Sequence, residues 1–292
     1  MSEKQARSPV LPGRLDTGYV STGEEIAIVV LNWNGVYFLQ RALESIVRFT
    51  NSNYQLVLID NGSTDKSKDF IEDFVQDNKE LNTTCLDFSE NIYFSRAFNQ
   101  GIKATLDSVR YVVVFCNDVE VKQINWLNEL LSTMQETNAA LVGNTHTAYV
   151  TDEQREIYQN NHPDYDDVVI SQAMRKFLNK ADASYTQVDG YCYMLDKNQL
   201  VESGLFLQGG DFYQYNSDWE LYMRLNALGL SIEQHLPKVH HWHSLSELIA
   251  LYPDRYVELI MALQDPQVLK RYLDVGRPLF SEESGFRSSQ LS

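Results

Sequence analysis

The chain has 292 residues, 43% of them hydrophobic and 22% charged, which is enough for a sizeable core in one large domain or two ordinary ones. Its net charge of −16 disfavours nucleic acid as a partner without excluding it, because tight sequence-independent binding needs a basic surface. Three scattered cysteines form no disulfide framework and no zinc motif, so we expect a reducing compartment.

The N-terminal segment does not resemble a structured element. Residues 1–24 are polar, contain Pro and Gly, and show no periodicity, which predicts a flexible leader rather than a secretory signal. No apolar run approaches the ~20 residues that a transmembrane helix needs. We therefore expect a cytoplasmic protein, either free in solution or attached to a membrane surface.

From residue 25 onward, short runs rich in Ile, Val and Leu alternate with amphipathic stretches. The short runs are typical of buried parallel strands, whereas the stretches between them repeat apolar residues at helical spacing. Through residue 137 this order predicts a mostly parallel sheet with helices on its faces. The expected strands are 26–34, 54–60, 83–89 and 111–116, and the expected helices are 35–49, 66–78 and 94–106.

The second half of the chain begins with an acidic insertion and is less regular. Ser217 and Gly229 are typical helix caps and indicate one amphipathic helix between them. The expected elements are a helix around 168–180 inside the insertion 150–183, a strand, Gly turn and strand at 185–196, a short helix at 197–204, one or two strands at 230–244, and helical spacing at 246–275.

These elements predict three parts. The leader of residues 1–24 is followed by one domain at 25–245, whose first half (25–145) holds the parallel sheet and whose second half (146–245) begins with the insertion. Residues 246–292 are expected to form a helical C-terminal extension and tail.

Polar residues follow the apolar strands of the predicted sheet. Asn32 and Asn34 follow the first strand, Asp60 ends the second, and Asn117 and Asp118 follow the strand at 111–116. Open parallel sheets bind their ligands beyond the carboxyl ends of the strands, so these side chains predict a ligand site. Asn and Asp also favour ordinary turns, and this simpler interpretation stays open.

Several fragments, in unbroken order, resemble family 2 glycosyltransferases of the GT-A fold. LVLIDNGSTDKS is similar to that family's second strand and turn, and VFCNDVEV to the strand ending in its metal-binding Asp-x-Asp. The other similar fragments are VVLNWN, ENIYFSRAFNQGIKA, VDGYCYMLDKNQLVESGLF, SDWELYMRLNALGLSI and PKVHHWHSLS. The resemblance extends over roughly residues 26–246. It implies an α/β fold with a central, mostly parallel, Rossmann-like sheet flanked by helices.

The resemblance implies an inverting transferase that moves a sugar from a nucleotide diphosphate, with UDP- or dTDP-sugars favoured, to an acceptor hydroxyl. The acceptor stays open among glycans, lipid-linked molecules, proteins and other hydroxyl compounds. A divalent cation, Mn²⁺ or Mg²⁺, would stabilise the charge on the departing diphosphate. Asp118 and His243 are the metal ligands that the resemblance implies, although Cys116 stands where the family usually has its first Asp.

A donor nucleotide site is implied in the first half of the chain. Asp60 matches an Asp that accepts a hydrogen bond from the base, which fits uracil or thymine, and turn chemistry explains the same residue. Asn99 is equally a packing amide, and an isolated helical Arg such as Arg96 is often a solvated charge. The donor-binding residues implied are Asn32, Asn34, Asp60, Asn91, Arg96, Asn99 and Asn117.

A catalytic base is implied at the start of the helix at 217. Asp218 matches the family's base, which would take the proton of the attacking hydroxyl. A carboxylate in the first turn of a helix is also favourable against the helix dipole, so a structural role is the alternative. Glu220 is the substitute base. Glu220, Trp219 and Trp242 are expected on the acceptor side, with a core position as the alternative for Trp242.

Two other function classes compete with a transferase. A nucleotidylyltransferase of the same fold needs a Gly-rich, basic loop after the first strand, and NWNGVYFLQR is poor in both. A non-catalytic module that binds sugar nucleotides or glycans is the second alternative, because Cys116 and Ser217 replace two acids of the family pattern.

Overall fold

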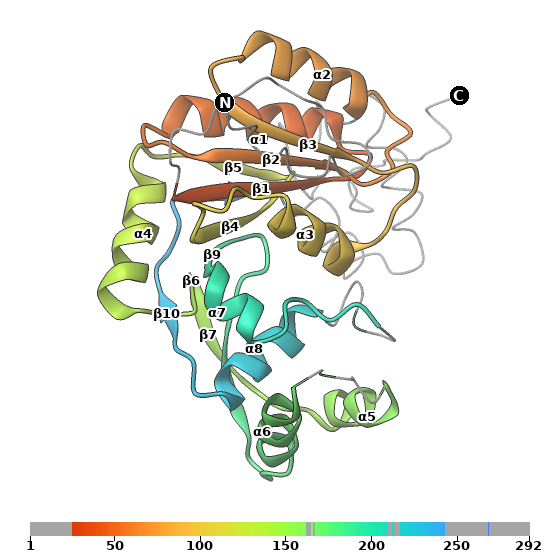
Figure 1. Ribbon diagram of the computed structural model, residues 1–292, viewed down its shortest axis with the longest axis vertical. Coiled ribbons are helices and arrows are strands. Elements are labelled where there is room, and N and C mark those ends of the chain that lie inside the picture. Colours follow the sequence, from red (N-terminus) through yellow and green to blue (C-terminus); the bar gives the residue numbers. More distant parts are fainter. Residues whose placement is uncertain are drawn as a thin grey trace, which may run out of the picture.

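The computed structural model describes residues 25–161, 165, 167–209, 212, 217–242 and 268. These residues build a seven-stranded sheet in the order β10-β6-β9-β4-β1-β2-β3, flanked by helices (Figure 1). The α/β architecture expected from the sequence is therefore confirmed. The predicted leader, and the predicted helical extension at 246–292 apart from Val268, lie outside the described residues.

The first half of the chain supplies four adjacent parallel strands. Each of β1, β2 and β4 is buried along nearly its whole length, which explains their continuous apolar composition. Neighbouring strands are in register at their carboxyl ends, where Asn32 lies opposite Asp60. The strands are β1 (Ile26–Asn32), β2 (Gln55–Asp60), β3 (Asn82–Asp87) and β4 (Tyr111–Cys116).

The helices bury apolar stripes against both faces of this sheet. One face packs against α3 (Phe94–Lys103) and α8 (Ser217–Ala227). The other face packs against α1 (Val36–Phe49), α2 (Ser67–Asp77) and α4 (Trp126–Thr137). Burial of each large apolar side chain contributes about 1.5–3 kcal/mol, so these two core layers stabilise the arrangement that positions the strand ends.

The strand, turn and strand expected at 185–196 is present, but its two strands do not pair with each other. β9 (Cys192–Asp196) runs antiparallel between β4 and β6 (Leu141–Gly143), whereas β8 (Ser184–Val188) pairs with β7 (Thr145–Tyr149). Parallel pairing of β10 (Ile232–Gln234) with β6 completes the central sheet. A second small sheet pairs β5 (Val119–Val121) with β11 (Val239–His241).

The insertion folds into α5 (Asp152–Asn161) and α6 (Val168–Leu178), and α7 (Lys197–Glu202) follows β9. In Figure 1 the two insertion helices lie at the end of the molecule opposite α1 and α2. Within the described ranges, every helix is too short or too polar to cross a lipid bilayer.

Candidate active site

Hydrogen bonds join the carboxyl ends of three neighbouring strands. Asn32 Nδ2 donates to Asp60 Oδ2 and to Ser63 Oγ, each at 3.3 Å, and Asn117 Nδ2 donates to Asn32 Oδ1 at 2.7 Å. Asp60 Oδ1 accepts from the Ser63 backbone N–H at 2.8 Å. The structure therefore brings three of the predicted donor-site residues together, and Asp60 also has the turn role that the sequence left open.

The turn after β2 is held by Asn34 and by close backbone packing. Asn34 Oδ1 accepts from the N–H groups of Thr64, at 2.7 Å, and Asp65, at 3.3 Å. Gly62 has φ +79°, and a Cβ there would lie 2.3 Å from the carbonyl carbon of Glu90. A side chain at this position would push the two loops apart, so the Gly of the NGSTD turn is required by packing.

The loop after β3 packs against this turn through a pair of amides. Asn61 Nδ2 donates to Asn91 Oδ1 at 2.9 Å, and Asn61 Oδ1 accepts from the Ile92 N–H at 2.9 Å. Tyr93 follows with φ 67° and ψ 171°, a conformation that only Gly adopts readily. The Tyr thus introduces backbone strain beside the predicted nucleotide site.

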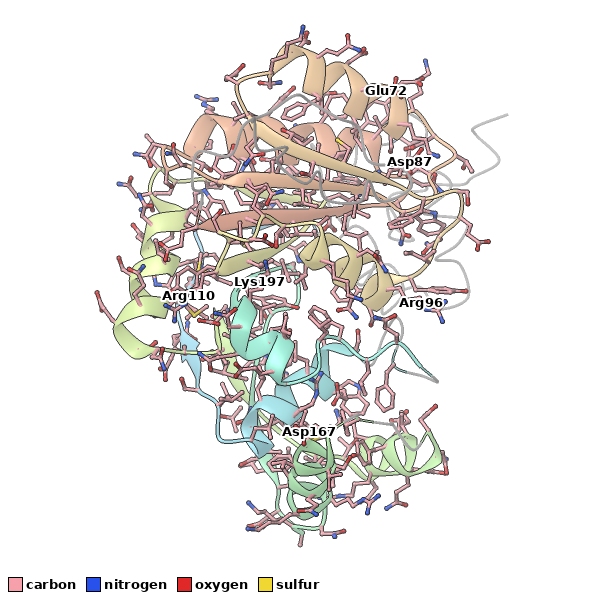
Figure 2. The ribbon with its side chains drawn as sticks, in the orientation of Figure 1. Glu72, Asp87, Arg96, Arg110, Asp167 and Lys197 are labelled. Atoms are coloured by element: carbon pink, nitrogen blue, oxygen red, sulfur yellow. The ribbon has the colours of Figure 1, made fainter. Side chains whose placement is uncertain are left out.

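Asn99 and Arg96 both belong to α3 (Phe94–Lys103). The Asn99 side chain donates to the Phe206 carbonyl at 2.8 Å and accepts from the Phe206 N–H at 3.1 Å. This two-way pairing supports the packing interpretation over a direct nucleotide contact, because both polar groups of the fully buried amide are used. Arg96 is exposed on the first turn of α3, as Figure 2 shows.

Asp118 lies at the turn between β4 and β5 and is 6% exposed. Its Oδ2 is 3.3 Å from Nε2 of His241, which β11 brings alongside through its pairing with β5. The Asp118 carbonyl accepts from the Trp242 N–H at 2.9 Å. His243, the predicted ligand, lies outside the described residues, and His241 is the histidine that the described structure places beside Asp118.

Cys116 does not supply the missing acid. Its Sγ is 3.8 Å from the Gly190 carbonyl, and burial followed by the nearby carboxylates of Asp118 and Asp218 raises the pKa of the thiol well above its ordinary value. The described residues contain no group of three or more His, Cys, Asp or Glu side chains arranged to hold a metal. One carboxylate and one imidazole fit a divalent ion that takes its other ligands from phosphate oxygens and water.

A charged network fixes β11 in place. Glu120 on β5 pairs with both Arg41 and Lys122, and it accepts from Trp242 Nε1 at 3.1 Å. Burial opposes ionisation of Glu120, but the hydrogen bonds from Lys122 and Arg41 outweigh it and lower the pKa of the carboxyl. The Arg41 guanidinium lies 5.0 Å from the Trp242 ring centroid. Trp242 therefore packs against α1.

Asp218 is the second residue of α8 and is partly buried. Its Oδ1 is buried and accepts no hydrogen bond from the described residues. Burial raises the pKa of Asp218 to about 7. A Cβ built on Gly190 would lie 2.9 Å from Asp218 Oδ2, so the carboxylate rests against the bare Cα of the β8–β9 turn. A carboxylate with this pKa is suited to accept a proton near neutral pH.

Glu220 has a different setting, although it is two residues away. It is fully buried and accepts two hydrogen bonds from Arg224, at 2.9 and 3.0 Å, and one from the Tyr165 hydroxyl at 2.5 Å. Arg224 also donates to the carbonyls of Ser203 and Leu205. The pair braces the segment before α8, so the structure favours a structural role for Glu220 over its predicted acceptor-side position.

The β8–β9 turn is the part of the site that the sequence pattern missed. Gly190 contacts Asp218, and the Tyr191 ring stacks on His241 with centroids 4.3 Å apart. Gly190 indicated a turn in the sequence, but its neighbours come from distant elements. Trp219, the remaining acceptor-side prediction, is partly buried and packs edge-on against Phe212 at 5.5 Å.

Comparisons with known sequences agree with the order of these elements. A family model described as Glycosyl transferase family 2 matches residues 27–195. An uncharacterised glycosyltransferase of Nostoc sp. is 27% identical over 128 residues, covering 44% of this chain and 38% of that protein. The glycosyltransferase GlyG of Streptococcus pneumoniae is 25% identical over 185 residues, covering 63% of this chain and 58% of GlyG. The chain thus spans less than two thirds of the length of either relative.

Among solved structures, the fold is similar to that of the mannosyltransferase PcManGT from Pyrobaculum calidifontis, determined in complex with GDP-Man and Mn²⁺. The TM-score is 0.54 at 13% sequence identity, over 87% of this chain and 71% of that one. This likeness supports the same overall fold.

Proposed function

Since the chain belongs to glycosyl transferase family 2, we propose that it transfers a sugar from a nucleoside diphosphate to an acceptor hydroxyl with inversion at the anomeric carbon. The observation that carries the proposal is the convergence of Asp118 and Asp218 on the turn between β8 and β9. Asp218 rests against Gly190, and Asp118 reaches Tyr191 of the same turn through the stacked His241.

This arrangement suits a single in-line displacement. A sugar lying at the turn has the diphosphate on the Asp118 side and the incoming hydroxyl on the Asp218 side, so attack and departure occur at opposite faces of the anomeric carbon. Asp218, whose pKa of about 7 leaves much of it ionised at neutral pH, takes the hydroxyl proton. Asp118 and His241 would hold a divalent ion, which when bound would stabilise the negative charge of the leaving diphosphate.

The nucleoside is assigned to the joined ends of β1, β2 and β4. Asn32, Asp60 and Asn117 lie there in one hydrogen-bonded group, beside the Asn34 turn and the Asn91 loop. An acidic group at Asp60 favours a base that offers an N–H, which uracil, thymine and guanine do. UDP- and dTDP-sugars are the preferred donors, and GDP-sugars belong in the same screen because the solved relative binds GDP-Man.

The experiment is a thermal-shift screen of UDP, dTDP, GDP and CDP, each with and without Mn²⁺. A ligand at 100 times its Kd should add about 2.7 kcal/mol of stability. We expect a shift with one nucleoside diphosphate that Mn²⁺ enlarges in the wild type but not in Asp118→Asn. The exposed Asp152→Asn on α5 is the control and should match the wild type. A chain that no nucleoside diphosphate stabilises would contradict the proposal.

The non-catalytic alternative keeps one observation in its favour, namely Cys116 in place of an acid. Release of nucleoside diphosphate from the matching nucleotide sugar, measured against a panel of glycan and lipid-linked acceptors, separates it from a transferase. For a transferase, Asp218→Asn retains the thermal shift and loses release by about 100-fold or more. A module binds the donor and gives no release with either protein.

A further inference from the structure

A cluster of polar side chains lies next to the site, one strand beyond Asp118. Asp189 Oδ2 accepts from Asn144 Nδ2 at 2.7 Å and from the Tyr191 hydroxyl at 3.1 Å. The His146 ring lies on the other side, with Nε2 3.6 Å from Asp189 Oδ1. We name these four residues, Asn144, His146, Asp189 and Tyr191, the Asp189 cluster. Neither the sequence pattern nor the proposed mechanism assigns them a role.

The cluster is continuous with both halves of the proposed active site. Tyr191 stacks on His241, which lies 3.3 Å from Asp118 Oδ2. Gly190, the next residue after Asp189, meets the Asp218 carboxylate. The Asp189 carboxylate therefore belongs to the three-residue turn that lies between the assigned diphosphate side and the assigned base.

The order of strands along the sheet places a specific part of the donor here. Asp60 ends β2 and Asp118 follows β4, two strands away, while Asp189 precedes β9, the next strand after β4. Strands lie about 4.8 Å apart, so this next position is about one sugar ring beyond the diphosphate. The nucleoside, the diphosphate and the transferred sugar would then occupy successive strand ends.

The chemistry of Asp189 suits sugar hydroxyl groups. The hydrogen bonds from Asn144 and Tyr191 both go to Oδ2 of Asp189. Among the described residues, the only polar neighbour of Oδ1 is the His146 ring, whose Nε2 at 3.6 Å is too far for a hydrogen bond. The Tyr191 hydroxyl donates to Oδ2, which helps to fix the direction of the carboxylate. The Asp189 side chain is 28% exposed, which leaves an oriented carboxylate oxygen open to a hydroxyl donor.

We propose that Asp189 accepts hydrogen bonds from hydroxyl groups of the transferred sugar and so selects among donor sugars, held in orientation by Asn144 and Tyr191. The inference rests on the proposed function, because it takes the positions of the diphosphate and the base from it. A purely structural role, in which Asp189 joins the β8–β9 turn to the segment between β6 and β7, predicts different results.

The test compares two affinities for each protein by titration calorimetry: that of the nucleoside diphosphate and that of the same nucleotide carrying the sugar. The probes are UDP with UDP-glucose, dTDP with dTDP-glucose, and GDP with GDP-mannose, taking the pair that the wild type binds. We expect Asp189→Asn to weaken binding of the nucleotide sugar about tenfold or more and to leave the Kd of the nucleoside diphosphate unchanged. Asp182→Asn, exposed before the other end of β8, is the matched control and should change neither.

A second variant separates sugar binding from turn structure. Tyr191→Phe keeps the ring stacked on His241 and removes one bond to Asp189, so it should weaken nucleotide-sugar binding by a smaller factor than Asp189→Asn. If Asp189→Asn binds the nucleoside diphosphate and the nucleotide sugar more weakly by the same factor, Asp189 has a structural role. If both affinities are unchanged, Asp189 is an acceptor-side residue. Either result overturns this inference and leaves the proposed function standing. A wild type that binds none of the three nucleotide pairs overturns the proposed function and the inference together.

Discussion

Two acids that lie two residues apart in the first turn of α8, Asp218 and Glu220, illustrate how surroundings decide the role of a residue. Glu220 is enclosed and neutralised by Arg224, so its charge is committed to the fold. No described residue supplies Asp218 with such a cation, and burial raises its pKa to about 7. The sequence offered both as bases. The contacts of the folded chain distinguish them, because Arg224 pairs with Glu220, whereas burial of Asp218 raises the pKa of its carboxyl.

The raised pKa of Asp218 predicts a pH dependence with a definite sign. As a base Asp218 acts ionised, so the transfer rate should rise with pH, about tenfold per unit, and level off above about 7. The folded pKa lies above the unfolded value of 3.8, so stability contributed by protonated Asp218 is present below about pH 4 and lost by about pH 7. Asp218→Asn should therefore gain stability relative to the wild type over that interval.

Urea unfolding of both proteins at pH 4.5 and pH 8 measures this difference. The shift of about three pKa units corresponds to at most about 4 kcal/mol, and partial solvent contact of the residue reduces it. A difference between variant and wild type that is the same at both pH values would show that the Asp218 pKa is not raised.

Gly190 is predicted to be essential for a steric reason. A methyl group there would lie 2.9 Å from Asp218 Oδ2, so Gly190→Ala should displace the carboxylate and lower the transfer rate about 100-fold. Gly209→Ala is the matched control, since a Cβ at that position has nothing within 4 Å. Both variants should bind the nucleoside diphosphate as the wild type does. Full activity in Gly190→Ala would separate Asp218 from the chemistry.

At the scale of elements, local patterns predicted most strands and helices but not the partners that bring site residues together. The apolar runs of β1, β2 and β4 and the helix α8 follow from composition and periodicity. The predicted cap at Ser217 is wrong, because α8 begins at Ser217 itself and the buried Ser217 hydroxyl has no hydrogen-bond partner among the described residues. The insertion of β9 between β4 and β6 does not, because the pairing of Phe115 with Cys192 joins residues far apart in the chain. The position of His241 likewise depends on the pairing of β11 with β5. The sequence has histidines at 240, 241 and 243, and their spacing alone does not show which of them lies beside Asp118.

The brace between α8 and the segment before it should contribute to stability rather than chemistry. Glu220→Gln leaves Arg224 buried without its full counter-charge, which should lower the free energy of unfolding by about 3 kcal/mol or more. The double variant Glu220→Gln/Arg224→Met should recover only part of the lost free energy of unfolding, because the carbonyls of Ser203 and Leu205 lose their hydrogen-bond donor.

Urea midpoints of the single and double variants measure this loss, with Glu202→Gln, exposed on α7, as the control expected within about 0.5 kcal/mol of the wild type. A Glu220→Gln protein with unchanged stability and abolished transfer would instead identify Glu220 as the base.

At the scale of the whole molecule, the two halves expected from the sequence share one sheet. β9 of the second half lies between β4 and β6 of the first, and β10 extends the same sheet beyond β6. Two side chains of α3 add to this connection: Ser95 donates to the Phe212 carbonyl at 2.9 Å, and Asn99 pairs with Phe206. A half that loses its partner would expose two edges in the middle of a buried sheet.

This shared sheet predicts that the described domain unfolds in one step and that a nucleotide bound to the first half stabilises both. Differential scanning calorimetry should give a single transition, and a saturating nucleoside diphosphate with Mn²⁺ should move it upward by about 5–10 °C as a whole, given about 2.7 kcal/mol at 100 times Kd. Hydrogen exchange provides the local readout: with ligand bound, amides of β8 and β9 should gain protection together with those of β1 and β2. Two calorimetric transitions, of which the ligand moves one, would show that residues 25–145 fold independently. Asp218, the proposed base, would then belong to a separately folding unit, and the turn at Gly190 would not hold Asp218 at a fixed position relative to Asp118.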